Sequence, residues 1–383
     1  MHLERLPFRS TVADYETQAD GLLQAWRAGG PDAVEFFRTN HPRFRHEEIR
    51  WLAKEVPPEN VRNAPFDLAD AQLAIARWYD FRDWPPLTEW VEAVAEDGSA
   101  IEKFESTVEA VIHGDAAALD RLLRDNPNLV HARSTRIAPF DPPRHRATLL
   151  HYVGANGVEG YRERTPPNAV EIAKMLLEAG ADPDALADMY GGQHATMAML
   201  VSSGHVAKTG LHVPLIDTLV DYGASVEGVG TGDWVSPLMT ALAFGFRDAA
   251  EALVRRGARI VTLAAAAGLG RLEEAVQLLP GASPEDRHCA LALAAQNGSA
   301  GIVRLLLDAG EDPNRYNPKQ NHSHSTPLHQ AVWSGHMYIV RLLVERGARL
   351  DIKDTIWHGT PLGWAEYGGR KEIAEFLRAQ QNK

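Results

Sequence analysis

The chain has 383 residues, of which 45% are hydrophobic and 23% charged, and this balance excludes a disordered protein. Its formal net charge of −12 and its pI of about 5.7 argue against a general nucleic-acid binder. The single cysteine excludes an intramolecular disulfide and fits a reducing compartment. No uninterrupted apolar stretch reaches the roughly 18 residues of a membrane-spanning helix, and the first residues contain no apolar signal-peptide core.

Residues 1–100 contain no repeated pattern and predict a set of helices. Leu22, Leu23 and Trp26 recur at helical spacing in the first of them. Asp67 is placed to cap a later helix, and Pro85 and Pro86 stand where a helix begins. We expect this region to be a helical domain of its own.

From about residue 104 onward a pattern recurs, and it is clearest near the C-terminus. Thr326 and Thr360 open two nearly identical segments, and 360 − 326 gives a period of 34 residues. A period of this size is typical of a repeat array.

Each repeat predicts two short helices. Thr326 caps the first helix and Pro327 occupies its first turn, where a missing N–H costs nothing. Gly335 ends the first helix, and Gly347 ends a second helix with an apolar stripe over 339–343. Two short helices cannot bury their apolar faces alone, so each unit must stack on copies of itself.

The spacing of 12 residues between the two helix-ending glycines finds earlier copies of the unit. Gly298 with Gly310 and Gly245 with Gly257 have it. Together with weaker copies it predicts about eight units between 104 and 383. The units within 147–228 are irregular and carry two inserted loops, 158–168 and 206–213.

The segment 326–331, with the sequence TPLHQA, resembles the signature T-P-L-H-x-A of the ankyrin-repeat family. The segments 305–314 and 176–184 resemble the family's second-helix ending. The resemblance implies an all-α solenoid of about eight helix-turn-helix units over 101–383, regular over 289–378, with residues 1–100 as a helical cap that covers one end. The segment 68–91 resembles a helical region that precedes ankyrin repeats in many bacterial proteins, and this predicts a bacterial, cytoplasmic protein.

Three features of the sequence invite a chemical interpretation. His322, His324 and His329 lie close together, but His329 is the signature histidine, which in the family bonds backbone within the solenoid. Cys289 lies beside a histidine at the expected start of a first helix, and a buried apolar role is favoured over a nucleophile. The glycine-rich 228–234 lacks the phosphate-loop pattern. We therefore predict no catalytic residue, no metal site and no cofactor.

The resemblance implies a concave groove lined by turn tips and by the exposed ends of the first helices. We predict a non-catalytic scaffold that binds a protein or peptide partner there, with no role in binding nucleic acid or membrane. Exposed aromatic side chains are the typical anchors of such a surface. The predicted partner-binding residues are Trp333, Trp357, Tyr367, Phe244, Tyr316, Trp234 and His358.

The inserted loops support an alternative hypothesis. Long irregular loops in a compact array are often functional. The irregular units 147–228 and the N-terminal helices would then form the pocket of an enzyme or of a small-molecule-binding protein. The predicted residues of this pocket are Tyr161, Arg162, Arg164, His194, His205 and His212.

Overall fold

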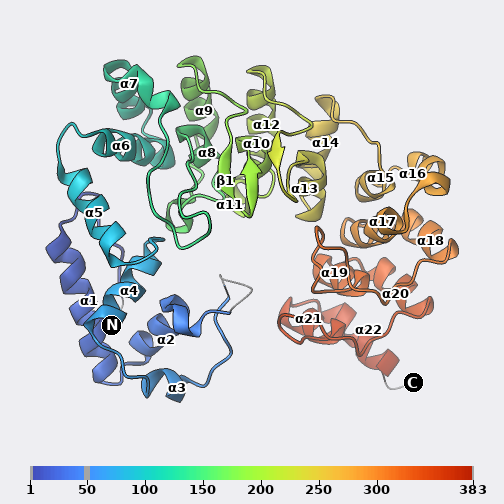
Figure 1. Cartoon of the computed structure of the whole chain (residues 1–383). Helices are drawn as coiled ribbons and strands as arrows, with labels where there is room; N and C mark the ends of the chain where they lie inside the picture. Colours follow the sequence, from blue (N-terminus) through green and yellow to red (C-terminus); the bar gives the residue numbers. More distant parts are fainter. Residues whose placement is uncertain (1–2, 47–51, 382–383) are drawn as a thin grey trace. The chain divides into compact units, whose positions relative to one another are not determined.

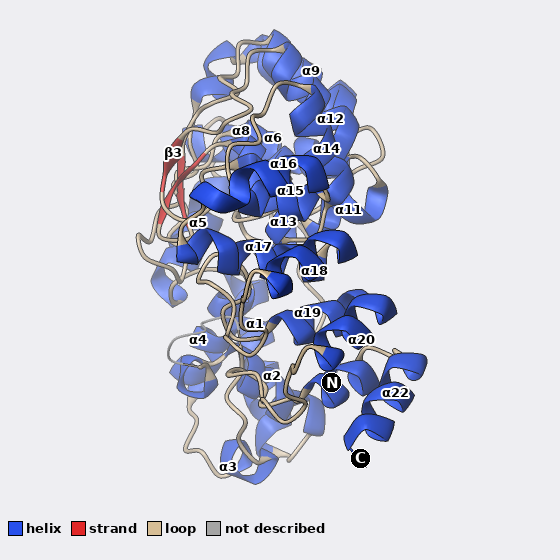
Figure 2. Ribbon diagram, turned by 90° about the vertical axis from the view of Figure 1, so that its right-hand side faces the viewer, coloured by secondary structure: helices blue, strands red, loops and turns tan. Residues whose placement is uncertain are grey.

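The computed structural model describes residues 3–46 and 52–381, and helices make up nearly all of its regular structure (Figure 1). Figure 2 shows the same predominance of helices, with only short strands among them. The chain divides into two compact units, Met1–Met199 and Leu200–Lys383, which we describe separately. No described helix has the length and apolar character needed to cross a membrane.

The N-terminal region of the first unit contains the helices that the sequence predicts. Thr11 and Asp14 form a reciprocal capping box at the first helix, and Asp67 and Asp70 form another at the fourth. The helices of this region are α1 (Val12–Arg27), α2 (Pro31–Asn40), η1 (Pro42–Phe44), α3 (Pro58–Arg62), α4 (Leu68–Trp78) and α5 (Trp84–Ala95).

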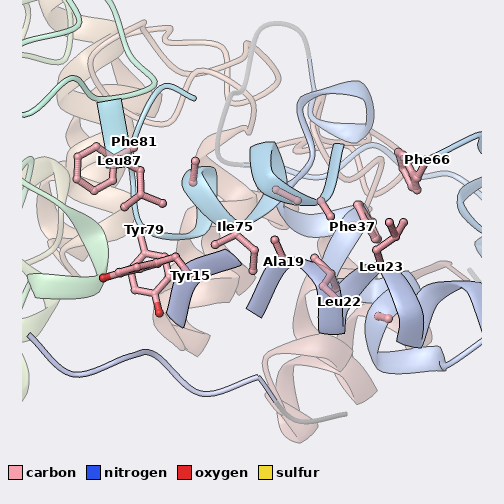
Figure 3. Packing of buried hydrophobic residues seen from close by; sticks show 14 of the residues in the cluster. Tyr15, Ala19, Leu22, Leu23, Phe37, Phe66, Ile75, Tyr79, Phe81 and Leu87 are labelled. Carbon is pink, nitrogen blue, oxygen red and sulfur yellow. The ribbon is translucent and has the colours of Figure 1, made fainter. Parts of the chain in front are cut away.

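These helices enclose a hydrophobic core of their own. Leu22 of α1, Phe37 of α2 and Ile75 of α4 are fully buried and pack together (Figure 3). The Phe37 ring stacks on Phe66 with centroids 4.1 Å apart. Trp84, at the start of α5, packs against this cluster from its edge. The N-terminal region is thus a helical bundle with an apolar interior.

The described residues from 100 to 381 form eight successive helix pairs, as the repeat count predicts. Short 3₁₀ turns follow three of these helices: η2 (Pro127–His131), η3 (Gly160–Arg162) and η4 (Leu279–Gly281). The pairs are α6 (Ala100–His113) with α7 (Ala116–Asp125), α8 (Leu149–Gly154) with α9 (Ala169–Glu178), α10 (Thr196–Leu200) with α12 (His212–Asp221), α13 (Pro237–Ala243) with α14 (Arg247–Arg255), α15 (Leu263–Leu269) with α16 (Leu272–Leu278), α17 (Pro284–Gln296) with α18 (Ala300–Asp308), α19 (Pro327–Ser334) with α20 (Met337–Glu345), and α21 (Pro361–Tyr367) with α22 (Lys371–Gln381).

The pairs stack in the way a solenoid requires. In the second unit the first helices α15, α17, α19 and α21 contact one another in order, and so do the second helices α16, α18, α20 and α22. The ends of α19 follow the predicted signals. Thr326 caps it, and Gly335 ends it with a left-handed φ of 81°. Ile339, Val340 and Leu343 of α20 are buried, so the predicted apolar stripe faces the neighbouring helices.

The irregular units differ from the prediction in two places. A short antiparallel hairpin joins β1 (Ala187–Met189) to β2 (Gly192–His194), with Ala187 opposite His194, and β3 (Gly230–Thr231) is a two-residue strand. The loop expected at 206–213 is largely helical: α11 (Gly204–Thr209) fills its first half, because Ser203 caps that turn and Gly210 ends it in the left-handed conformation.

Cys289 also lies elsewhere than predicted. It is in the middle of α17, because Ser283 and Pro284 start this helix before the expected position. The thiol is free and partly buried.

Candidate functional site

Three of the predicted partner-binding residues come together at the last two helix pairs. Trp333 lies in the last turn of α19, Trp357 lies in the turn before α21, and Tyr367 ends α21. The rings of Trp333 and Tyr367 stack with centroids 6.4 Å apart and planes at 19°. Trp364 lies behind them, 6.0 Å from Trp333 and 6.2 Å from Trp357. We call Trp333, Trp357, Trp364 and Tyr367 the aromatic cluster.

The outer members of the aromatic cluster are accessible to solvent. Trp333 is 47% exposed, Trp357 46% and Tyr367 89%. Trp364 is partly buried and packs against Trp333 and Trp357. Large aromatic side chains held on rigid helix ends lose little rotamer freedom when a partner covers them. This arrangement provides apolar contact area at a small entropic cost.

The turn that presents Trp357 is organised by a residue that the sequence analysis missed. Asp354 is buried, and its carboxylate accepts hydrogen bonds from the N–H groups of Ile356 at 2.9 Å, Trp357 at 2.6 Å and Gly359 at 2.8 Å. It also accepts one from the indole Nε1 of Trp364 at 2.9 Å. Burial opposes ionisation, but these four donors outweigh it and hold the pKa of Asp354 below its ordinary value. An aspartate that precedes a turn and bonds its backbone is a recognisable signal.

The signature histidine bonds the backbone, as the resemblance implies. His329 Nδ1 lies 2.8 Å from Thr326 Oγ1, and His329 Nε2 lies 3.2 Å from the carbonyl oxygen of Gly359 in the next repeat. Burial lowers the pKa of His329 to about 4. His151 makes the same contacts in the first unit, to Thr148 Oγ1 at 2.9 Å and to the carbonyl oxygen of His194 at 3.2 Å.

The two other histidines of the candidate metal cluster have structural contacts. His322 Nε2 lies 2.8 Å from the carbonyl oxygen of Ala243, and the His324 ring packs on Trp357 with centroids 5.2 Å apart. Among the described residues, no group of three or more His, Cys, Asp or Glu side chains is placed to hold a metal ion.

The remaining predicted partner-binding residues lie in the second compact unit, as the aromatic cluster does. Trp234, partly buried, contacts the exposed Phe244 edge to face at 5.5 Å. Tyr316 is 42% exposed, and its hydroxyl donates to the carbonyl oxygen of Lys353 at 2.7 Å. His358 is exposed beside Trp357 in the Asp354 turn. All seven predicted partner-binding residues therefore belong to the second compact unit.

The first inserted loop contributes to a buried ion-pair network in the first unit. Arg162 is fully buried and bonds Glu105 at 2.5 Å and Glu109 at 2.9 Å, both on α6. Glu159 is buried with His145 at 2.7 Å and Arg136 at 3.2 Å. Burial opposes ionisation of Glu159, but the charge of Arg136 outweighs it, so its pKa lies below the usual range.

The other residues of the alternative pocket have varied surroundings. Tyr161 packs on Tyr79 with ring centroids 5.7 Å apart, and Arg164 is exposed with Nη1 3.1 Å from His113 Nε2. His194 is fully buried in the first unit. In the second unit His205 is exposed, and His212 Nε2 lies 3.0 Å from the carbonyl oxygen of Leu200. Arg162 and His212 thus make structural contacts.

Comparison with known proteins gives relatives for the repeat region. The family profile described as "Ankyrin repeats (3 copies)" matches residues 262–354. Human "Cyclin-dependent kinase inhibitor 2A" is 36% identical over 121 residues, which cover 30% of this chain and 75% of the relative. Human "Cyclin-dependent kinase 4 inhibitor B" is 36% identical over 120 residues, or 30% of this chain and 84% of the relative.

Two longer relatives are matched over a smaller share of their length. Mouse "Ankyrin repeat and SAM domain-containing protein 6" is 35% identical over 109 residues, which cover 28% of this chain and 12% of the relative. Mouse "B-cell lymphoma 3 protein homolog" is 28% identical over 213 residues, or 56% of this chain and 40% of the relative. The eight helix pairs, together with the backbone contacts of His151 and His329, match what these similarities imply, and the chain belongs to the ankyrin-repeat family.

Proposed function

We propose that the chain is a non-catalytic scaffold that binds a protein or peptide partner through the turns and first-helix ends of its second unit. The aromatic cluster is the centre of this surface. The observation that carries the proposal is the exposed stack of Trp333 on Tyr367, which Trp364 supports from behind. Aromatic side chains of this kind supply a large part of the binding free energy in protein interfaces.

The family supports the same kind of function. Ankyrin repeats are typically protein-interaction modules, and their rigid helix ends present side chains without a folding step. The anchors of the proposed surface are Trp333, Trp357 and Tyr367, with Phe244, Tyr316, Trp234 and His358 around them.

The test is affinity capture of partners from cells of the organism that encodes the chain, with the captured proteins quantified by mass spectrometry. We expect Trp333→Ala to weaken capture of the specific partner by about 30-fold, the loss typical of an interface anchor. The matched control is Tyr338→Ala, because Tyr338 is 55% exposed but lies on the second helix α20.

Two outcomes would contradict the proposal. One is equal capture by wild type, Trp333→Ala and Tyr338→Ala. The other is a large fall in melting temperature for Trp333→Ala, which would assign this side chain to the core of the last two helix pairs and not to a binding surface.

A further inference from the structure

The segment that precedes α1 places one arginine against three aromatic rings of the first unit. The Arg5 guanidinium carbon lies 4.6 Å from the ring centroid of Trp78 and 4.5 Å from that of Tyr161. It lies 5.3 Å from the ring centroid of Tyr79. Trp78 ends α4, Tyr79 follows it, and Tyr161 lies in the η3 turn of the insert 158–168. We call the rings of Trp78, Tyr79 and Tyr161 the Arg5 cage.

The rings of the Arg5 cage meet at steep angles, so they present their faces to a cation from several directions. The planes of Trp78 and Tyr79 differ by 64°, and those of Tyr79 and Tyr161 by 81°. The face of an aromatic ring attracts a cation that lies within about 6 Å of its centroid. Trp78 and Tyr161 are partly exposed, so the cage lies at the surface of the first unit.

The cage suits a guanidinium group in particular. Nη1 of Arg5 donates a hydrogen bond to the carbonyl oxygen of Trp78 at 2.6 Å, while the group contacts the rings. A guanidinium is planar, stacks on aromatic rings and is more weakly hydrated than an ammonium, so it loses less when it leaves water. The contacts of Arg5 therefore show which chemistry this site accepts.

Asp80 gives the Arg5 cage a negative charge. It follows Tyr79 in the chain, and its Oδ2 accepts a hydrogen bond from the backbone N–H of Tyr161 at 3.4 Å, which joins the insert to the end of α4. Burial raises the pKa of Asp80 to about 6, and the positive charge of Arg5 is the strongest effect that opposes this rise. Asp80 and a cation in the cage thus stabilise each other.

Arg5 is held less firmly than the buried arginines of the same unit. No carboxylate among the described residues forms an ion pair with Arg5, whereas the buried Arg162 pairs with Glu105. Residues 3–10 form no helix or strand, and Arg5 is itself partly exposed. A local displacement of this segment would therefore open the cage to solvent.

The distribution of charge favours a basic partner for the first unit. Residues 1–199 contain 21 Lys and Arg against 32 Asp and Glu, a formal net charge of −11. The first unit thus carries nearly all of the chain's net charge of −12. A surface with this sign of charge raises the local concentration of cationic ligands and speeds their association.

We propose that the Arg5 cage is a binding site for an arginine side chain of a basic protein partner, and that Arg5 occupies it as an internal ligand which the partner displaces. The partner's guanidinium would stack on Trp78 and Tyr161 and donate to the carbonyl oxygen of Trp78. This inference goes beyond the proposed function, because the cage belongs to the first unit and the aromatic cluster to the second.

The first test opens the cage with Arg5→Ala in the full chain. The probe is N-acetylarginine N-methylamide, a single arginine with uncharged ends, and its binding is measured by ligand-detected NMR. We expect Arg5→Ala to bind the probe with a dissociation constant on the order of a millimolar. The wild type should bind it at least about tenfold more weakly, because Arg5 competes from within the same chain.

Two related probes test the chemistry of the site. The corresponding lysine compound has the same charge but lacks the planar fork, and the citrulline compound has the same shape but no charge. We expect the lysine compound to bind Arg5→Ala about threefold to tenfold more weakly than the arginine compound, and the citrulline compound to show no binding.

Arg9→Ala is the matched control for Arg5→Ala. Arg9 lies in the same segment, but its ion pairs are with Asp97 and Glu102. This variant should bind the arginine probe as weakly as the wild type does. In the Arg5→Ala background, Tyr161→Leu removes one wall of the cage and should abolish binding. Thermal melts establish that the variants fold, and the comparison of the three probes needs only Arg5→Ala.

Displacement of Arg5 is tested in the wild type. The backbone N–H of Leu6 donates to the hydroxyl of Tyr79 at 2.7 Å, so its hydrogen exchange reports whether the segment is in place. We expect this exchange to become faster as the arginine probe occupies the cage, while the amides of α1 keep their rates.

The inference is overturned if Arg5→Ala binds the arginine probe no better than the wild type or Arg9→Ala does. It is also overturned if the citrulline probe binds equally well, or if binding survives Tyr161→Leu. An unchanged Leu6 amide at saturating probe would show that Arg5 is a fixed structural group and would overturn the displacement. The proposed function is tested separately, because Trp333→Ala changes only the second unit.

Discussion

At the residue scale, the two signature histidines, His329 and His151, make the same backbone contacts in different repeats. His329 and His151 each accept from a capping threonine at Nδ1, which places the proton on Nε2 for the bond to a carbonyl of the following turn. A second proton at Nδ1 would face the backbone N–H of Thr326 or Thr148. Burial, the main cause, lowers the pKa of each histidine to about 4.

The first prediction concerns the pH dependence of stability. An unfolded histidine titrates near about pH 6.5, whereas folded His329 titrates near pH 4, so between these values the unfolded chain binds the extra proton. Stability should therefore fall as the pH is lowered from about 6.5 to 4, by up to about 3 kcal/mol for this residue. Urea unfolding at several pH values measures this fall.

The matched variants are His329→Gln and, as the control, the exposed His358→Gln. His329→Gln should be less stable at neutral pH and should show a shallower fall toward pH 4, while the control keeps the wild-type slope. Parallel curves for all three proteins would contradict this account of His329.

The second prediction concerns the turn that carries Trp357. Asp354→Ala removes the acceptor of four hydrogen bonds, and we expect a loss of about 2–4 kcal/mol in local stability. Hydrogen exchange of the Ile356, Trp357 and Gly359 amides should become faster. Asp351→Ala is the control, since Asp351 is exposed and pairs with Arg349 at the surface, where we expect little effect on stability. Equal exchange in both variants would show that the turn does not depend on Asp354.

At the element scale, the insert 158–168 is a structural part of the first unit. Its residues Glu159 and Arg162 are buried among Glu105, Arg136 and His145. The sequence indicates this segment as irregular and polar, but it gives no signal that the charges point inward. Their partners are distant in sequence, and only the packed structure brings them together.

The third prediction tests that role. Arg162→Met leaves the buried carboxylate of Glu105 without its guanidinium partner, and we expect a loss of about 3–5 kcal/mol in the free energy of unfolding of the first unit. The double variant Arg162→Met with Glu105→Gln should recover part of it. Arg164→Met, at the exposed position of the same insert, should have little effect. A tolerated Arg162→Met would favour the alternative hypothesis of a ligand pocket.

The helix pairs themselves were predictable because their signals are local. Ser or Thr caps, Pro in the first turn and Gly at the end fix α19 and α21 within a few residues, and the period of 34 residues finds their copies. Cys289 was misplaced because Ser283 and Pro284 start α17 early, a variation within one unit that the shared period hides.

At the scale of the whole molecule, sequence and structure differ most where contacts are non-local. The number of repeats and the positions of the aromatic anchors follow from the 34-residue sequence pattern, because that pattern recurs in each repeat. The stacking of Trp333 on Tyr367 joins neighbouring repeats, and the repeated pattern places these two positions side by side. The aromatic packing of Phe37 on Phe66 in the N-terminal bundle, and the reach of His322 to Ala243, depend on chain segments that no repeat relates.

In a solenoid of stacked repeats, we expect a destabilising substitution to act mainly on its own repeat and on the neighbouring repeats. Each pair contacts chiefly its neighbours, so the stability of the array is approximately a sum over units and their interfaces. Leu377 of α22 is fully buried in the last pair, and Leu377→Ala should cost about 2–5 kcal/mol there. We expect the backbone amides over 360–381 to lose protection from hydrogen exchange, and those of α19 and α20 to lose it to a smaller degree, while the amides of α4 and α6 keep theirs.

The complementary variant Leu22→Ala should instead expose the amides of α1 and α4, which contact each other, and leave those of α21 and α22 protected. Uniform loss of protection along the chain in either variant would mean that the molecule unfolds as one cooperative body and that its repeats are not energetically separable.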